Sequence, residues 1–212
     1  ISTIDGTETA ISFDTGATPP TVTITNGGGP VTYNGVTEPS QSGAVTIAVF
    51  CFTDIDMQVA PTVTGDRPLG LVSKADVNLT AAIDLSGGDG TDDPARGPGT
   101  GANVAGGAAG PAGGFPGPDQ GTAPDTTLYG PGTGEDGGLG NQAGDGAGHG
   151  GMGGLRGQTN DSIGGAIYSD AALTDLYGGS GGGAGRVDNS TNAAGGGGGG
   201  GGGAIEVAAA GS

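Results

Sequence analysis

The residues best suited to chemistry are the aspartates of Gly87-Gly-Asp-Gly-Thr-Asp92 and the adjacent Asp93. This segment matches the first six positions of the calcium-binding nonapeptide G-G-x-G-x-D-x-U-x. Pro94 stands where that nonapeptide has an apolar strand residue, and the chain has one copy where tandem copies share each ion. Coincidence in a chain rich in Gly and Asp is therefore the favoured interpretation. If the protein binds a metal, the candidate ligands are Asp89, Asp92 and Asp93, and calcium is the candidate ion.

Two further side chains could take part in metal binding or catalysis, and each stands alone. His149 lies between glycines, and the sequence has no second histidine to complete a zinc site. Cys51 lies between Phe50 and Phe52, without the basic neighbour that a reactive thiolate needs. We expect a surface or inter-segment histidine and a buried, inert thiol, with an intermolecular disulfide as the minor alternative for Cys51.

An acidic pair, Asp54 and Asp56, falls on one face of a predicted strand and could suggest glycoside hydrolysis. Aromatic residues make up only 4% of the sequence and Trp is absent, so the chain lacks aromatic platforms for sugar. No glycine cluster precedes Lys-Ser/Thr or a long helix, as a phosphate-binding loop would. The sequence therefore predicts that the protein is not an enzyme and uses no cofactor.

The charge balance restricts the partners. The formal net charge is -17, and Lys74 is the only lysine. Nucleic acids and anionic membranes attract basic patches, so neither is expected as a partner. No apolar stretch is long enough to cross a membrane. The Thr-, Ser-, Asn- and Asp-rich composition is typical of extracellular or cell-surface proteins, and a first residue Ile1 without a leader indicates a processed product or an excised fragment.

Residues 1–86 have the pattern of a β module. Residues 21–25 alternate β-branched side chains and run into a turn cluster at 26–30. The longest apolar stretch, residues 44–59, has one face that begins apolar and ends acidic, so we expect its first half to be buried on both sides. Apolar residues alternate again in residues 77–85.

Residues 87–203 form a glycine-rich insert that ends in nine consecutive glycines. Because glycine loses the most backbone freedom on folding, an ordered glycine run must be held by backbone contacts. The best-known ordered state of such a chain is an extended, polyproline-II-like helix paired with its neighbours. The Gly-X-Y period of collagen is absent, for example across 121–130, and residues 169–177 are the one helical candidate.

Strand character returns in residues 204–212, where Ile205, Val207 and Ala209 alternate with Glu206 and Ala208. The sequence thus predicts an all-β protein with three parts. A β-sandwich or β-solenoid module (1–86) is followed by a long ordered glycine-rich, polyglycine (polyproline-II-like) insert (87–203) and by a returning strand (204–212).

Three segments carry a resemblance to a known group: the strand pair 65–88, the motif 176–183 and the run Gly-Gly-Gly-Ala204-Ile-Glu-Val207. They resemble secreted bacterial glycine-rich surface proteins over roughly residues 65–210, and this resemblance implies a β-solenoid-like fold without assigned chemistry. The glycine segment is also similar in kind to the polyglycine sandwich of certain phage tail-fibre adhesins.

The sequence favours an extracellular structural protein, a subunit of a filament or surface matrix whose main partner is itself. Exposed strands at residues 1–13 or 205–209 would complete the sheet of a neighbouring subunit. The alternative is an adhesin or receptor-binding module of a phage or bacterial surface fibre. In that case loops such as residues 117–129 would bind a cell-surface or glycan partner.

Overall fold

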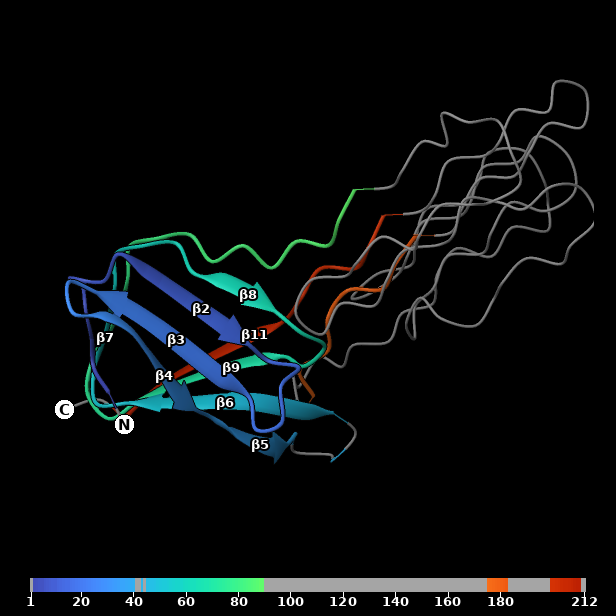
Figure 1. Cartoon of the computed structure of the whole chain (residues 1–212). Coiled ribbons are helices and arrows are strands. Elements are labelled where there is room, and N and C mark those ends of the chain that lie inside the picture. The colour runs from blue at the N-terminus through green and yellow to red at the C-terminus, as the bar shows by residue number, and fades with distance from the viewer. Residues whose placement is uncertain (1, 41–42, 44, 90–174, 183–198, 211–212) are drawn as a thin grey trace, which may run out of the picture. The chain divides into compact units, whose positions relative to one another are not determined.

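The computed structural model describes residues 2–40, 43, 45–89, 175–182 and 199–210 (Figure 1). These residues contain eleven strands and no helix, which confirms the all-β class for this part of the chain. None of the described segments is therefore a helix that could cross a membrane. The chain divides into two compact units, here called the strand unit (Ile1–Leu85, Thr174–Leu176, Ala204–Ser212) and the glycine unit (Ser86–Leu173, Tyr177–Gly203).

All the strands belong to the strand unit, and most are short. In chain order they are β1 (Ile4–Asp5), β2 (Ala10–Asp14), β3 (Thr21–Asn26), β4 (Gly29–Asn34), β5 (Val36–Pro39), β6 (Thr46–Phe52), β7 (Ile55–Met57), β8 (Thr62–Thr64), β9 (Leu69–Ser73), β10 (Val77–Leu79) and β11 (Ile205–Ala209).

The strands form three sheets. The first has the order β1-β7-β10, the second β11-β9-β6-β5 and the third β4-β3-β2-β8. The contacts β1–β7, β7–β10, β6–β9, β9–β11 and β2–β8 are parallel. The contacts β2–β3, β3–β4 and β5–β6 are antiparallel, as expected for neighbours joined by short turns.

The parallel contacts arise because the chain visits the sheets repeatedly in the same order. From β6 it passes to β7 and β8, each in a different sheet, and it then returns so that β9 lies beside β6 and β10 beside β7. Leu69 is thereby placed beside Ala48, and Val77 beside Ile55. β1 lies on the other side of β7, and β2 lies beside β8, again in parallel.

The core consists of the apolar side chains that these strands direct to one side. The buried cluster contains Ile4, Ile11, Phe13, Val22, Ile24, Ala48, Phe50, Phe52, Ile55, Met57, Leu69 and Leu71. Phe13 and Phe50 meet edge to face, with ring centroids 5.1 Å apart and planes at 61°. On the opposite face of β6, Ile47 is buried and Val49 is half-buried. The expectation that this strand is covered on both sides therefore holds for Ile47 and only in part beyond it.

Turns follow the local chemistry of the sequence. The β3–β4 hairpin closes with Asn26 paired to Gly29, which has a φ of 102°. The Asn26 side chain accepts a hydrogen bond from the Gly28 amide at 3.0 Å, as expected for an Asx turn. The turn cluster predicted at residues 26–30 is thus confirmed.

A close backbone approach links the ends of β2 and β8. Gly65 has a φ of 108°, and a Cβ on it would lie 2.1 Å from the Gly16 nitrogen, so only glycine fits there. The Thr15 hydroxyl, which is fully buried, donates to the Thr64 carbonyl at 3.0 Å. The Arg67 guanidinium donates to the carbonyls of Thr15 and Ala17 at 2.7 and 3.0 Å. These bonds hold the two turns together.

The core predicts a large cost for truncating Phe50, which is 2% exposed and contacts Phe13. We expect Phe50→Ala to lower the free energy of unfolding by about 3–5 kcal/mol, because the lost burial leaves a cavity. Val36→Ala, at a side chain that is 50% exposed, should change it by less than about 0.5 kcal/mol. Urea denaturation monitored by circular dichroism measures both, and equal effects would contradict this description of the core.

Candidate functional site

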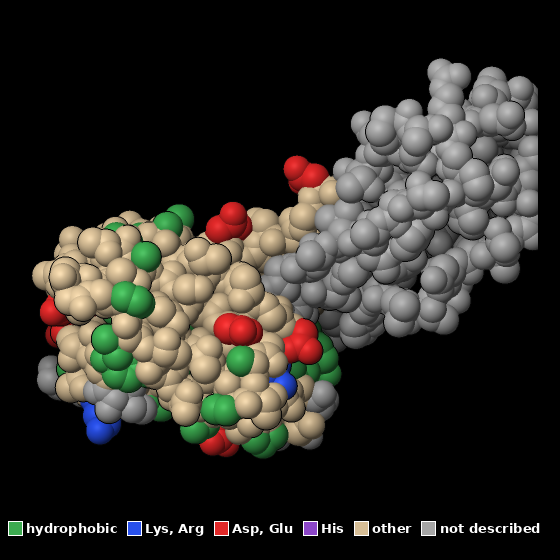
Figure 2. Space-filling model, viewed as in Figure 1, with side chains coloured by type: hydrophobic (Ala, Val, Ile, Leu, Met, Phe, Trp, Pro, Cys, Tyr) green, Lys and Arg blue, Asp and Glu red, His purple; other side chains and the backbone are tan. Residues whose placement is uncertain are grey.

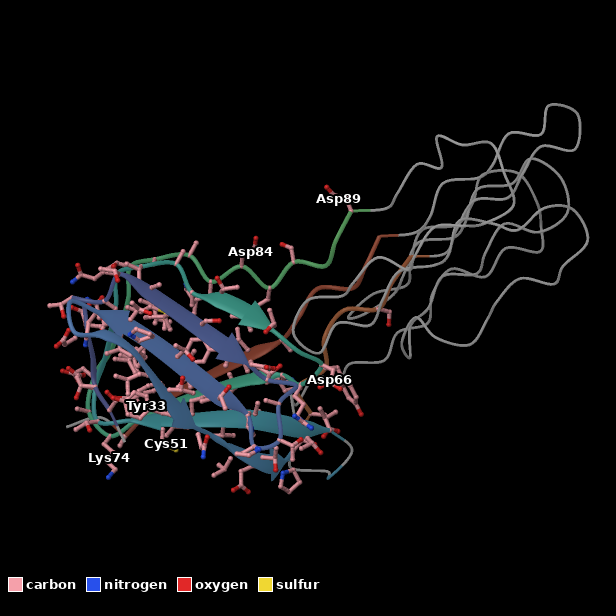
Figure 3. All side chains as sticks on the ribbon, viewed as in Figure 1. Tyr33, Cys51, Asp66, Lys74, Asp84 and Asp89 are labelled. Atoms are coloured by element: carbon pink, nitrogen blue, oxygen red, sulfur yellow. The ribbon has the colours of Figure 1, made fainter. Side chains whose placement is uncertain are left out.

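The predicted metal ligands fall at the edge of the described chain. Asp89 is exposed and lies beyond the strands, at the end of the stretch 45–89 (Figure 3). Asp92 and Asp93 lie outside the described residues. Within the described residues, no three His, Cys, Asp or Glu side chains are grouped so that they could hold a metal ion. Calcium binding at these aspartates stays a prediction.

Cys51 is a free thiol in β6 and is half-buried, so the expectation of a fully buried thiol is only partly met. It lies in register with Val72 of β9, on the face of β6 opposite Phe50 and Phe52. His149, the other lone candidate, lies outside the described residues.

Asp56 belongs to a row of polar residues across the first sheet. Asp5, Asp56 and Asn78 are in register on β1, β7 and β10. The Asp56 carboxylate accepts hydrogen bonds from the side-chain amide of Asn78 at 2.8 Å and from the side-chain amide of Gln58 at 2.9 Å. Asp54 precedes β7, and its carbonyl accepts the Ile4 amide at 3.1 Å. These contacts give Asp56 a structural role in cross-strand pairing.

The turn after β1 is closed by two carboxylates. Glu8, 7% exposed, accepts hydrogen bonds from the amides of Asp5 and Gly6 at 2.9 and 3.0 Å. Asp5 accepts one from the Thr7 hydroxyl at 2.6 Å and one from the Thr7 amide at 3.0 Å. The hydrogen bond from the Thr7 hydroxyl, followed by that from the Thr7 amide, lowers the pKa of Asp5 below its ordinary value.

Because the pKa of Asp5 is lowered in the folded state, its carboxylate stabilises the fold at pH values above its ordinary pKa of about 4. This stabilisation is lost as the pH falls through the lower pKa of the folded state. We expect Thr7→Val to raise the pKa of Asp5 toward the ordinary value, because the hydroxyl donor is removed. NMR titration of the Asp5 side chain measures this shift, with Thr37→Val on the exposed strand β5 as the control. An unchanged Asp5 titration in Thr7→Val would contradict the assignment of cause.

One contact had no signal in the sequence. The buried Ser40 hydroxyl donates to the Asp175 carboxylate and also accepts the Val45 amide at 3.2 Å. This contact joins residues far apart in the chain, and composition alone gave no reason to pair them. Asp175, Leu176 and Tyr177 are not helical; they are the described end of the helix predicted at residues 169–177, and the rest of that segment lies outside the described residues.

The end strands of the sheets are the most distinctive surface feature. Among the described residues, the exposed large apolar side chains are Val31, Val36, Leu79 and Val207. They lie on β4, β5, β10 and β11 respectively, and each of these strands is at one end of its sheet. On the face shown in Figure 2, Lys and Arg side chains are sparse and hydrophobic side chains occur at scattered places on the strand unit.

The two strand regions proposed for assembly differ in their exposure. In residues 1–13, β1 pairs with β7 on one edge, while β2 pairs with both β3 and β8. Ile4, Ile11 and Phe13 are buried, so the apolar side chains of this region belong to the core, and of its two strands only β1, an end strand, has a free edge. β11 pairs on one side with β9, and residues 206–209 are exposed.

The described parts of the glycine unit are held by backbone hydrogen bonds that do not belong to a sheet. The Gly179 amide donates to the Gly202 carbonyl at 2.8 Å, and the Gly182 amide donates to the Gly199 carbonyl at 3.0 Å. The two segments therefore run antiparallel, with bonds three residues apart. The Gly200 amide instead donates to the Gly88 carbonyl at 2.8 Å. A β-ladder repeats every two residues, whereas a polyproline-II helix has three residues per turn.

This contact leaves no room for a side chain at two of its glycines. A Cβ on Gly201 would lie 1.8 Å from the Gly179 carbonyl oxygen, and one on Gly87 would lie 2.2 Å from the Gly200 carbonyl oxygen. Both neighbours are backbone atoms, which cannot rotate away as the end of a side chain can. Glycine is therefore required at these two positions by packing.

Comparison with known proteins identifies no relative: no family model, no curated protein and no solved structure matches this chain.

We expect Gly201→Ala to separate the glycine segments, because the added methyl carbon would overlap the Gly179 carbonyl. The control is Gly27→Ala, at a hairpin position where a Cβ meets nothing within 4 Å. Hydrogen exchange at the Gly179, Gly182 and Gly200 amides measures the effect. Exchange should accelerate at least about tenfold in Gly201→Ala if local opening costs about 1.4 kcal/mol less, and it should be unchanged in Gly27→Ala. Equal protection in both variants would show that these segments are not packed together.

Proposed function

We propose that this protein is an extracellular structural subunit of a filament or surface matrix, in which the addition of strands across sheet edges joins one subunit to another. The observation that carries the proposal is the position of Val31, Val36, Leu79 and Val207, all exposed and all on end strands. Edge strands present unpaired N–H and C=O groups, and a second chain can pair with them. Apolar side chains beside such an edge add hydrophobic burial to the pairing.

The stacking of strands supports the same proposal. We infer that the strands stacked in parallel belong to successive turns of a β-solenoid, since β6, β9 and β11 lie side by side in parallel and β1, β7 and β10 do so in a second sheet. In such a stack each turn buries its apolar residues against the preceding turn. Among the described strands β11 is the end of its sheet, and Val207 on it is exposed while Leu71 on the neighbouring β9 is buried.

We further infer that the glycine-rich insert is a polyglycine bundle of polyproline-II character. Its support is the three-residue spacing of the bonds from Gly179 to Gly202 and from Gly182 to Gly199. The separate direction of the Gly200 bond, toward Gly88, adds to this support, because a threefold helix directs successive amides to different neighbours. A bundle held by backbone bonds suits a structural material.

A receptor-binding module is the second candidate. It is favoured by Pro30 on β4 and Pro39 on β5, because proline on an end strand limits the addition of further strands there. A protein that does not polymerise could instead present loops to a cell-surface or glycan partner. The loop proposed for this role, residues 117–129, lies outside the described residues.

Electron microscopy of the purified full chain at increasing concentration tests the proposal. We expect regular assemblies, together with a scattering mass that increases with concentration above the 19.6 kDa of one chain. A chain that stays monomeric up to millimolar concentration would overturn the structural proposal. Binding of that monomer to a glycan array would then establish the receptor-binding alternative.

A further inference from the structure

The end strands differ in how their free sides are protected. The Gly35 amide donates to the Pro20 carbonyl at 2.7 Å, so alternation along β4 turns residues 30, 32 and 34 toward its unpaired side. The Ser40 amide donates to the Val45 carbonyl at 2.7 Å, and the same alternation turns Thr37 and Pro39 toward the unpaired side of β5. Pro30 and Pro39 therefore each remove a donor from a free edge without breaking a ladder hydrogen bond.

β11 has no such protection. The Leu69 amide donates to the Ala204 carbonyl and the Ala210 amide donates to the Ser73 carbonyl, both at 3.0 Å. Even-numbered residues of this parallel strand therefore face β9, and the N–H and C=O groups of Ile205, Val207 and Ala209 face the unpaired side. The strand contains no Pro or Lys, and residues 206–209 are exposed. Of the free edges of the described sheets, this is the longest one without proline.

We propose that β11 pairs antiparallel with β11 of a second copy of this chain, about a twofold axis that passes beside Val207. This inference rests on the proposed assembly by strand addition, and it names the edge, the partner and the symmetry. Ile205 then lies opposite the partner's Ala209, and Val207 lies opposite the partner's Val207. The second sheet continues from one copy into the other through its unprotected edge.

The register follows from self-complementarity. With the axis at Val207, the outward-facing residues 205, 207 and 209 of one strand all lie opposite outward-facing residues of the other. With the axis moved by one residue, one outward-facing residue of each strand has no partner in the other β11. Val207, on the core side like Leu71 and Phe50, is placed against its own copy and covers apolar surface that is 41% exposed. Glu206 lies opposite the partner's Ala208, while an axis centred on Glu206 would set two carboxylates directly opposite each other.

The twofold arrangement has a consequence for growth. A contact in which the same edge is used on both copies closes on itself, so β11 pairing ends at two subunits. Because Pro30 and Pro39 restrict the edges of β4 and β5, further strand addition is left to the other end strands, β1, β8 and β10. The paired molecule is then the building block of the filament or matrix.

Cysteine cross-linking tests the register. In a Cys51→Ser background, Glu206→Cys and Ala208→Cys are prepared as separate chains, mixed and oxidised. Residues 206 and 208 of the two copies form a non-hydrogen-bonded antiparallel pair, in which Cα atoms lie about 4.5 Å apart, within the range for a disulfide. We expect a covalent dimer of twice 19.6 kDa from the mixture only. No dimer in the mixture, or equal dimer from either variant alone, would overturn the proposed pairing.

A second experiment tests the edge itself. Val207→Pro removes the outward N–H and copies the device seen at Pro30 and Pro39, while Val207→Ala trims the side chain and keeps the N–H. Sedimentation should show dimerisation weakened about tenfold or more in Val207→Pro, because two amide donors are lost from the twofold pair at once. Val207→Ala should keep the dimer, and the unfolding temperature of both variants checks that β11 remains in place.

The outcomes separate this inference from the proposed function. Assemblies that form in the wild type and are unchanged by Val207→Pro would refute the β11 contact and leave assembly by another surface. A wild-type chain that is monomeric at all concentrations would refute both. Loss of the dimer in Val207→Pro with retained folding, together with the mixed disulfide, would establish the contact.

Discussion

The fold depends on parallel pairing of short strands, which brings apolar side chains from successive passages of the chain into one shared core. Leu69 is placed beside Ala48 and Leu71 beside Phe50 because β9 returns in parallel to β6. Each of these strands is too short to be stable alone, so hydrophobic burial in the stack has to offset the conformational entropy of ordering it. The same rule means that the first and last strands of each sheet meet solvent on one edge. Exposure of Val36 and Val207 is thus a consequence of the architecture, since each lies on an end strand.

Much of the local structure could be predicted from the sequence. Alternation of β-branched residues predicted β3, and the Asn-Gly-Gly-Gly cluster predicted the turn that follows it. Alternation also predicted a strand over residues 77–85, but β10 ends at Leu79. The reason is its partner: β7 ends at Met57, whose carbonyl accepts the amides of Thr80 and Ala81 as the ladder stops. Val77 and Ile83 pack on the core while Leu79 is exposed, so the periodicity identified the inward-facing residues in part and could not define the hydrogen-bonded length.

Pairings between distant segments could not be predicted in the same way. The strand character on both sides of the glycine-rich insert allowed the two strand regions to share one sheet, as β9 and β11 do, but it did not single out Leu69–Ser73 as the neighbour of residues 205–209. The partner of Ser40 at Asp175 has no local signature. Likewise, residues 1–13 have strand propensity, but propensity alone does not separate a strand on a free edge from β2, which is paired on both sides. For the glycine run, the kind of contact could be predicted from the sequence, because glycine can form hydrogen bonds only through its backbone. Backbone bonds between Gly179 and Gly202 are of the kind that its chemistry requires.

Charge and edge chemistry act in opposite directions in this protein. A net charge of -17 opposes the approach of two copies of the chain. Of the five residues of β11, however, only Glu206 is charged, so little of the repulsion arises from this strand itself. The edges of β4 and β5 carry prolines instead, and Glu38 adds a charge on β5. Among the end strands of the described sheets, proline therefore protects β4 and β5, and β11 is the longest one without it.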